Sequence, residues 1–473
     1  MTASPVRTLA LALLVAGLAC TACERPPNVI LINIDDLGWR DVGCFGSTRH
    51  ATPNIDTLCS QGVKFTNAYA AAAVCSPTRA ALLTGRHPAR TGVTDWIRPP
   101  GGRVQPRVVR DGIEYLNDPK RFLLAPPPPR ALPLEEITLA EALSEAGYAT
   151  AHIGKWHLGG RKALPVDQGF DSNQGGHAQG QPGSYFDPYT RKGLAGLPGL
   201  PPRKPGEHLT DREADEAVRF IRENRERPFF LNLWHHAVHP PIQGRADLVA
   251  KYAHLGERPA VYAAMVEGVD ESVGALLQVL DELELSENTL VIFTSDNGGW
   301  THVSENEPLR GGKGRPYEGG LRVPQIVRFP GRVPPAVSDA PVTSVDLLPT
   351  IFEATGIHSA AKEIDGTSLF PLLTRGSSSL SRPAIYWHYP HYWQNEVPYS
   401  VIRKGRYKLI RRYEGVRLEL YDLAEDLGEQ HDLAAARPDL ARELDADLDL
   451  WLRETGAIIP IPRARRVHAD RRR

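Results

Sequence analysis

Residues 28–36 read Asn28-Val-Ile-Leu-Ile-Asn-Ile34 and then Asp35-Asp36, an apolar run that ends in two carboxylates. Such a run is typical of a strand that is buried on both faces of a parallel sheet. A similar run at 289–293 stops at a polar cluster, Asp296-Asn297-Gly298-Gly299. Because carboxyl ends of parallel strands meet at one edge of a sheet, these polar groups are expected to lie close together.

The segments between the apolar runs show helical signals. Thr138-Leu-Ala-Glu141 is a capping-box pattern, and Gly147 closes the helix before a strand that runs from Tyr148 to Ile153. Helical periodicity also covers 211–224, ahead of a strand at 228–234, and a longer stretch around 260–284. Helices that alternate with apolar strands predict a doubly wound α/β fold, with a mostly parallel sheet flanked by helices.

The pattern changes near residue 380. Residues 399–421 alternate as short strands around turns at Lys404-Gly405 and Glu414-Gly415, and an apolar helix face with Trp451 follows. These signals predict a small C-terminal antiparallel sheet plus helix. We therefore divide the chain into four segments: a signal peptide at 1–23, a catalytic α/β domain at 24–378, an α+β subdomain at 379–456 and an Arg-rich tail at 457–473.

Composition limits the partners of the chain. The 473 residues are 41% hydrophobic and 23% charged, which suits a large folded core rather than a disordered chain. The 55 basic and 56 acidic residues nearly cancel, so no overall field would hold a polyanion. This balance argues against nucleic acid as a partner, and an anionic substrate must be held by local groups.

The N-terminus is typical of an exported bacterial protein. Arg7 precedes the apolar stretch Leu9 to Leu18, which is too short to span a bilayer, and Cys20 follows. Lipoprotein processing with a lipid anchor at Cys20 is one alternative. Simple cleavage of the signal peptide is a second, since the usual Leu is missing three places before this cysteine. A retained hydrophobic helix is a third. The predicted location is periplasmic, envelope-anchored or secreted, with membrane attachment only through such a lipid.

Three cysteines remain after this segment: Cys44, Cys59 and Cys75. An odd number in an exported protein leaves one thiol free or modified. Cys44 and Cys59 either form a disulfide or serve as small buried hydrophobes, and the residue pattern decides neither.

The stretch Cys75-Ser-Pro-Thr-Arg-Ala-Ala-Leu-Leu-Thr-Gly-Arg86 carries a Cys-x-Pro-x-Arg signature. It resembles type I sulfatases, the arylsulfatase-like branch of the alkaline phosphatase superfamily, and the resemblance covers roughly residues 28–455. It implies that Cys75 is oxidised to formylglycine by a maturation enzyme, and that the aldehyde hydrate supplies the nucleophile. Pro77 is tolerated in a first helical turn, which places residue 75 at a helix N-terminus, where an anion is favoured.

The resemblance also implies a metal site. Asp35, Asp36, Asp296, Asn297 and residue 75 match the family's ligands for one divalent ion. Donors that are all oxygen suit a hard cation such as Ca²⁺. Taken alone, an Asp-Asp pair after a strand is more often a turn or a helix cap, and a lone cysteine is more often a buried small residue.

Further motifs match the rest of the family's site: Gly154-Lys155-Trp156-His157-Leu158-Gly159, His239 in Ala-Val-His-Pro-Pro, Gly312-Lys313-Gly, and Glu318 to Pro324. By this resemblance, the metal, Lys155 and Lys313 neutralise the sulfate oxygens, and Arg79 orients the hydrate. His239 or Lys313 gives a proton to the leaving alcohol, and His157 is the base that releases sulfate from the enzyme. His235 and His236 fit no family role and stay unassigned, and isolated lysines are usually solvated surface charges.

The predicted function is hydrolysis of sulfate monoesters, on sulfated glycans in preference to small aryl sulfates. Tyr386-Trp-His-Tyr389 and His391-Tyr-Trp393 would suit stacking on a sugar ring, although aromatic clusters more often serve packing. Two alternatives are a phosphate or phosphonate ester hydrolase with the same nucleophile and metal, and a non-catalytic glycan-binding protein of the envelope.

Overall fold

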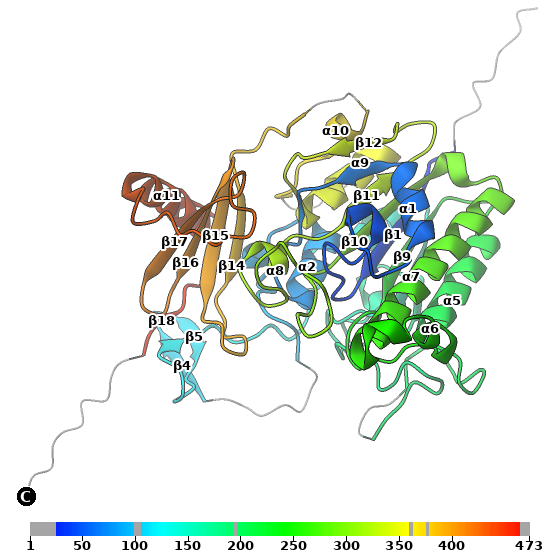
Figure 1. Ribbon diagram of the computed structural model, residues 1–473, viewed down its shortest axis with the longest axis horizontal. Helices are drawn as coiled ribbons and strands as arrows, with labels where there is room; N and C mark the ends of the chain where they lie inside the picture. The colour runs from blue at the N-terminus through cyan, green and yellow to red at the C-terminus, as the bar shows by residue number, and fades with distance from the viewer. Residues whose placement is uncertain (1–24, 99–105, 193–195, 359–362, 375–377, 464–473) are drawn as a thin grey trace, which may run out of the picture.

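The computed structural model describes residues 25–98, 106–192, 196–358, 363–374 and 378–463 (Figure 1). The predicted signal peptide with Cys20 lies outside the described residues, as does the tail from residue 464 onward. Among the helices of the described ranges, none is long and apolar enough to cross a membrane.

The core of the molecule is an eight-stranded sheet with the order β12-β2-β11-β10-β1-β9-β7-β8. Its strands are β1 (Asn28–Ile34), β2 (Val63–Phe65), β7 (Ala149–Gly154), β8 (Ser172–Gln174), β9 (Phe229–His235), β10 (Thr289–Ser295), β11 (Gln325–Arg328) and β12 (Ala336–Ser338). Strand β1 pairs in parallel with β10 and β9, and β7 pairs in parallel with β9 and β8, whereas β11 is antiparallel to both of its neighbours. The expected mostly parallel sheet is confirmed.

Alternate residues of β1 pack into two different helical layers. Ile30, Ile32 and Ile34 lie in one apolar cluster, and Val29 and Leu31 lie in another. The first layer is formed by α1 (Pro53–Ser60), α5 (Leu209–Glu223) and α7 (Glu257–Glu282), and the second by α2 (Cys75–Thr84), α4 (Leu139–Glu145) and α9 (Leu347–Thr355). Figure 1 shows α5 and α7 side by side along one side of the sheet. Burial on both faces explains why β1 is apolar at nearly every position.

Local signals mark most boundaries closely. The capping box is formed: the Thr138 hydroxyl accepts from the Glu141 amide at 3.1 Å, and the Glu141 carboxylate accepts from the Thr138 amide at 2.7 Å. Helices α5 and α7 begin two or three residues before the apolar periodicity indicates, because their first turns are largely polar, and the single buried Leu209 at the start of α5 forms no repeating pattern.

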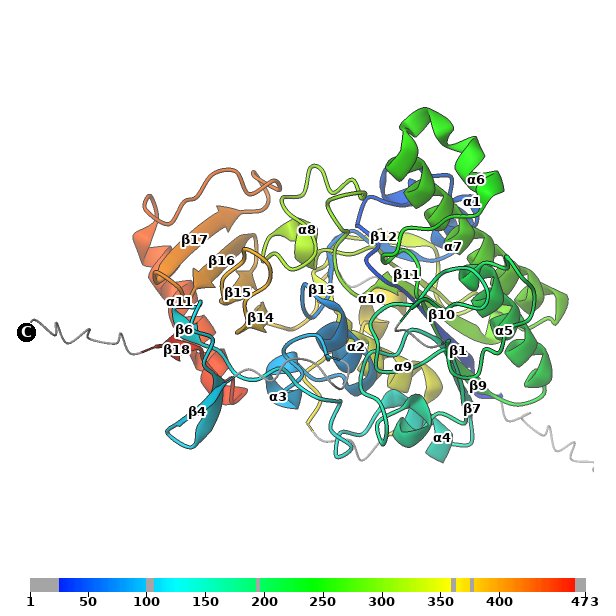
Figure 2. The ribbon, with the colours of Figure 1, turned by 90° about the horizontal axis from the view of Figure 1, so that it is seen from below.

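The C-terminal part is an antiparallel sheet backed by a helix, seen from two directions in Figures 1 and 2. Its elements are β14 (Ile385–Tyr389), β15 (Tyr399–Lys404), β16 (Tyr407–Arg412), β17 (Arg417–Asp422) and α11 (Pro438–Glu454). Ile402, Leu409 and Leu420 face α11, whereas Val401 and Ile410 face the large domain. The expected antiparallel sheet plus helix is confirmed, with β14 as an additional strand before residue 399.

The beginning of the segment that we assigned to the tail is part of the fold. Ile461–Pro462 forms β18, which pairs with β6 (Leu123–Leu124), and Ile459 packs against the apolar cluster beneath α11. Cys44 and Cys59 are half-buried free thiols that pack against the α5 and α7 layer.

Candidate active site

The carboxyl ends of the central strands bring the charged motifs together. Asp35 and Asp36 directly follow β1, Asp296 and Asn297 follow β10, and Lys155 follows β7. All five side chains are buried. This clustering follows from parallel pairing, because every strand that ends here delivers its next residue to the same edge of the sheet.

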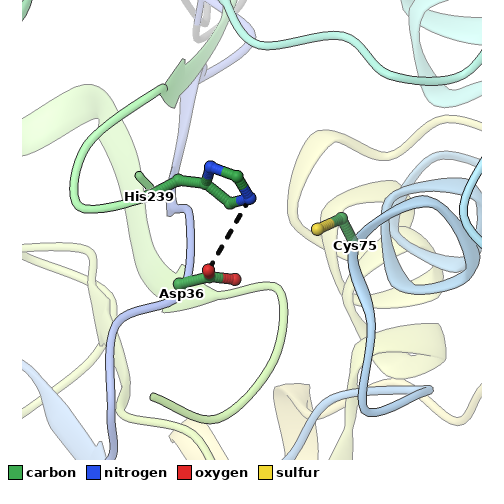
Figure 3. Close-up of side chains that lie close together, drawn as sticks. All are labelled: Asp36, Cys75 and His239. Atoms are coloured by element: carbon green, nitrogen blue, oxygen red, sulfur yellow. Dashed lines mark ion pairs between the residues drawn. The ribbon is translucent and has the colours of Figure 1, made fainter. Parts of the chain in front are cut away.

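Cys75 faces this edge from the first residue of α2. The helix starts at Cys75, as the position of Pro77 predicts, and the whole helix is buried. The Cys75 Sγ lies 3.7 Å from Asp35 Oδ1, and Figure 3 shows it facing Asp36 and His239. Burial raises the pKa of the Cys75 thiol to about 12, although the charges of Lys155 and Lys313 act in the opposite direction. The unmodified side chain is therefore a neutral thiol and a poor nucleophile.

The oxygen donors of this cluster fit a divalent cation. Ligand atoms of Asp35, Cys75 and Asp296 lie within 4.8 Å of one another, and so do those of Asp36, Cys75 and His239. The Oδ1 atom of Asn297 is buried without a hydrogen-bond partner among the described residues, while its amide nitrogen donates to Asp36 Oδ1 at 2.8 Å. An orphaned carbonyl oxygen beside three carboxylates is the donor set that Ca²⁺ prefers.

Three buried cations surround the carboxylates. Lys155 Nζ lies 2.6 Å from Asp35 Oδ2, and Lys313 Nζ lies 2.6 Å from Asp36 Oδ1. The Arg79 guanidinium bonds Asp296 Oδ2 at 2.7 Å and the Lys155 carbonyl at 2.8 Å. Arg79 thus connects α2 with the loops after β10 and β7, in addition to facing the Cys75 end of its own helix.

The pKa values of the two aspartates after β1 are shifted in opposite directions. Burial, together with the like charges of Asp296 and Asp36, raises the pKa of Asp35 despite the nearby Lys155. Burial would also raise the pKa of Asp36, but Lys313, His239 and Lys155 hold it below its ordinary value. The site therefore carries closely balanced charges, so an anion that enters it meets two lysines and an arginine already fixed in place.

His157 presents one ring nitrogen as a base. Its Nε2–H donates to the carbonyl of Ile97 at 2.8 Å, because a carbonyl can only accept, and Nδ1 is buried without a partner among the described residues. Burial and the charges of Lys155 and Arg79 lower the pKa of His157 well below its usual range. Its Nδ1 lone pair is thus available at neutral pH.

His239 also lines the pocket at Cys75, and its ring is directed at Asp36 (Figure 3). Its Nδ1–H donates to the carbonyl of Pro240 at 2.7 Å, and Nε2 lies 3.8 Å from Asp36 Oδ2. Burial and Lys313 lower the pKa of His239 well below its usual range. The imidazole is therefore neutral until negative charge near Asp36 favours the protonated form.

His235 and His236 do not face Cys75. Both imidazoles bind one buried carboxylate, Glu213 of α5, with Nδ1–O distances of 2.7 and 2.6 Å. Glu318, which belongs to a motif that matches the family's site, accepts hydrogen bonds from the Tyr69 hydroxyl and Lys408 away from the cluster.

A pocket of about 340 Å³ opens above Cys75. Besides Cys75, His157, His239 and Lys313, its lining includes Val74, Trp96, residues 179–181 and Trp393. Of the two aromatic segments, 386–389 and 391–393, only the second reaches the pocket, through Trp393. In the first segment, Tyr386 stacks on Trp451 with ring centroids 4.9 Å apart, and Trp387 and Tyr389 are buried. The segment 386–389 thus serves packing. Trp96 and residues 179–181 had no signal in the sequence, because they lie in loops without periodicity.

Comparisons with known proteins give one consistent result. A family model described as Sulfatase matches residues 27–357, and a second, N-sulphoglucosamine sulphohydrolase C-terminal, matches residues 313–454. Human (Homo sapiens) arylsulfatase A is 34% identical over 91% of this chain and 89% of its own length. N-acetylgalactosamine-6-sulfatase from Canis lupus familiaris is 34% identical over 80% of this chain and 72% of its own length.

Solved structures give the same result. The crystal structure of Ps i-CgsB in complex with k-i-k-neocarrahexaose superposes with a TM-score of 0.74 at 30% identity, covering 90% of this chain and 93% of that chain. The similarity therefore spans both the large domain and the C-terminal sheet.

Proposed function

The chain belongs to the sulfatase family and is a sulfuric ester hydrolase, and from this premise we propose that it removes sulfate from sulfated glycans by means of formylglycine at residue 75 and one Ca²⁺. The observation that carries the proposal is the position of Cys75. It begins a buried helix and faces Asp35, Asp36 and Asp296 together with Lys155 and Lys313. A purely structural cysteine does not need such a concentration of buried charge.

Residue 75 supplies the nucleophile once a maturation enzyme has oxidised it. A buried thiol with a raised pKa has little nucleophilic character, whereas a hydrated aldehyde offers one hydroxyl for attack and a second for release of sulfate. The helix N-terminus and Arg79 favour the negative charge that develops on these oxygens.

Asp35, Asp36, Asp296 and Asn297, together with residue 75, would hold Ca²⁺. When bound, this ion adds positive charge beside the sulfate oxygens, where it lowers the barrier to attack by a nucleophile. Lys155 and Lys313 also add positive charge, and their ion pairs with Asp35 and Asp36 hold them in place. Hydrogen bonds hold all of these side chains before substrate enters.

The two pocket histidines divide the proton transfers. The Nδ1 of His157 has a free lone pair and takes the proton whose loss releases sulfate from residue 75. His239 gives a proton to the departing alcohol, because a bound sulfate ester adds the negative charge that favours protonation of its Nε2. Lys313 is the second possible donor, and its pKa is raised by Asp36 and Cys75 against the effect of burial.

The shape of the pocket supports a sugar as the group that carries the sulfate. Trp96 and Trp393 are half-buried and offer flat apolar surface beside the reacting group. The name of one relative, N-acetylgalactosamine-6-sulfatase, specifies a sulfated sugar as its substrate. An exported enzyme would meet such polymers outside the cytoplasm, which is consistent with the N-terminal signal pattern of the sequence.

Sulfate release tests this proposal. Protein produced with a formylglycine-generating enzyme should release sulfate from members of a panel of sulfated mono- and oligosaccharides, and peptide mass spectrometry should find the aldehyde at residue 75. Full activity with an unmodified thiol would refute the role of residue 75. Faster hydrolysis of 4-nitrophenyl phosphate than of 4-nitrophenyl sulfate would instead favour the phosphate ester alternative.

A further inference from the structure

Glu213 is a carboxylate that does not line the pocket but binds the histidines at the end of β9, close to His239 in the chain. It is fully buried on α5, and both of its oxygens are used: Oε2 lies 2.7 Å from His235 Nδ1 and Oε1 lies 2.6 Å from His236 Nδ1. His235 has a second partner, because its Nε2 lies 2.9 Å from Ser272 Oγ. His236 Nε2 is buried and has no partner among the described residues, so the ring of His236 is held through Glu213.

His236 begins the turn that carries His239. The His239 amide donates to the His236 carbonyl at 3.2 Å, and the Tyr185 hydroxyl donates to the carbonyls of His236 and His239 at 2.5 and 2.9 Å. The same turn pairs with Asp35, whose amide donates to the Ala237 carbonyl at 3.0 Å and whose carbonyl accepts from the Val238 amide at 2.8 Å. A shift of this turn would therefore move His239 relative to the β1 carboxylates.

Glu213 also packs against the end of β7. A Cβ atom added to Gly154 would lie 2.1 Å from the Trp234 carbonyl and 3.3 Å from Glu213 Oε1, so only glycine allows this close approach. The next residue, Lys155, donates its amide to the same Trp234 carbonyl at 2.7 Å. One carboxylate thus lies beside the two strand ends that carry Lys155 and His239.

We propose that Glu213 is a positioning residue, which fixes the His236–His239 turn through His236 and so sets the position of the His239 imidazole over the pocket. The catalytic part of this inference rests on the proposed function, and the structural part does not. Glu213 is ionised in this setting, because His236 and His235 lower its pKa to about 2 against the effect of burial. An ionised carboxylate forms short, strong hydrogen bonds to two imidazole N–H groups.

The chain offers a matched control on the same helix. Glu216 lies three residues further along α5, is also buried, and bonds Arg212 at 2.9 Å and Arg219 rather than the turn. Glu213→Gln keeps the shape of the side chain but cannot accept from both imidazoles with both of its terminal atoms. Glu216→Gln makes the same chemical change on the same helix without touching the turn.

Amide hydrogen exchange tests the structural part without any need for activity. In full-length protein, Glu213→Gln should raise the exchange rate of the Val238 and His239 amides by about fivefold or more, because the turn opens more often. Glu216→Gln should leave these two amides unchanged. Equal protection of the turn in wild type and Glu213→Gln would overturn the proposal, whatever the activities are.

Leaving-group dependence tests the catalytic part. With matured enzyme, Glu213→Gln should slow the hydrolysis of phenyl sulfate, which has a poor leaving group, by about tenfold. It should slow the hydrolysis of 4-nitrophenyl sulfate by no more than about twofold. In a His239→Ala background, Glu213→Gln should cause no further loss of activity on phenyl sulfate. Equal slowing of both substrates, or full additivity with His239→Ala, would reject the positioning role. A wild-type enzyme inactive on sulfate esters would count against the proposed function, and hydrogen exchange would still decide the role of Glu213.

Discussion

At the scale of single residues, two of the proposed calcium ligands differ in their protein contacts. Asp296 has a second function, since its carboxylate pairs with the buried Arg79 at 2.7 Å. Asn297 Oδ1 has no protein partner among the described residues. The side-chain amide nitrogen of Asn297 donates to Asp36 Oδ1 and to the Gly298 carbonyl. The two side chains should therefore respond differently to substitution.

Asn297→Ala should lower the affinity for Ca²⁺ while it costs the metal-free protein only about 2 kcal/mol, the usual cost of losing a hydrogen bond to a charged group such as the Asp36 carboxylate. Asp296→Ala should lower the affinity and also destabilise the metal-free protein by about 3–5 kcal/mol, because Arg79 loses its closest counter-charge. Calcium titration calorimetry and urea unfolding in the presence of a chelator measure the two effects. Equal stability losses in both variants would contradict the distinction.

The two histidines that line the pocket at Cys75 should show different kinetic defects. His157→Ala should give a stoichiometric burst of alcohol with little free sulfate, because loss of the base leaves sulfate on the protein. His239→Ala should slow the first step, most strongly for poor leaving groups, because an activated phenol hardly needs a proton. Rapid-quench measurement of alcohol and sulfate separates these outcomes. Release of both products at equal rates from the first turnover of His157→Ala would refute its role as base.

At the scale of elements, the site residues at strand ends could be predicted from the sequence, whereas the residues that line the pocket walls could not. Asp35, Lys155 and Asp296 each follow an apolar strand, and parallel pairing necessarily gathers them at one edge. Trp96 and residues 179–181 lie in loops whose course depends on tertiary packing, so no local pattern marks them. Trp393 belongs to an aromatic segment that the sequence singles out, but only the structure shows that Trp393 lines the pocket while other aromatic residues nearby are buried.

Trp393 comes from the loop after β14 and packs against the chain at Gly314, where an added Cβ would lie 2.1 Å from the indole. It therefore connects the C-terminal sheet to the Lys313 side of the pocket. Trp393→Ala should raise KM for sulfated saccharides by about tenfold, since stacking on a sugar face is lost, with a smaller change in kcat. Tyr386→Ala, on β14 itself, should leave KM unchanged because Tyr386 packs on Trp451. Steady-state kinetics on one sulfated saccharide would decide, and an equal KM for both variants would contradict a contact with the sugar.

At the scale of the whole molecule, the two parts are joined through buried charge as well as apolar surface. The short helix α8 (Glu318–Leu321) brings Glu318 against the C-terminal sheet, where Lys408 of β16 lies 2.9 Å from both Glu318 Oε1 and Glu429 Oε1. The Glu318 amide also donates to Glu429 Oε2 at 2.7 Å. The family motif around Glu318 thus forms the joint between the two parts, and the loop just before it carries Lys313 into the pocket.

This joint predicts a pH-dependent variant. Lys408→Met removes the cation paired with the buried Glu429, while Glu318 keeps Arg322 at 3.6 Å, and it should lower the free energy of unfolding by about 3–5 kcal/mol at pH 7. In wild type, burial and the nearby Glu318 already raise the pKa of Glu429, and Lys408 is the group that opposes this rise. In the variant, the Glu429 carboxyl should bind its proton still more tightly in the folded than in the unfolded state, so the stability lost relative to wild type should shrink as the pH falls from 7 to 5. Lys404→Met is the control on the adjacent strand: Lys404 pairs with Glu443 and Asp447 at the surface, and its loss should cost less than about 1 kcal/mol with little dependence on pH. Urea unfolding of the three proteins at pH 5, 6 and 7 tests this prediction. A Lys408→Met variant whose loss of stability relative to wild type stays constant or grows toward pH 5 would show that Lys408 does not oppose the rise in the pKa of Glu429.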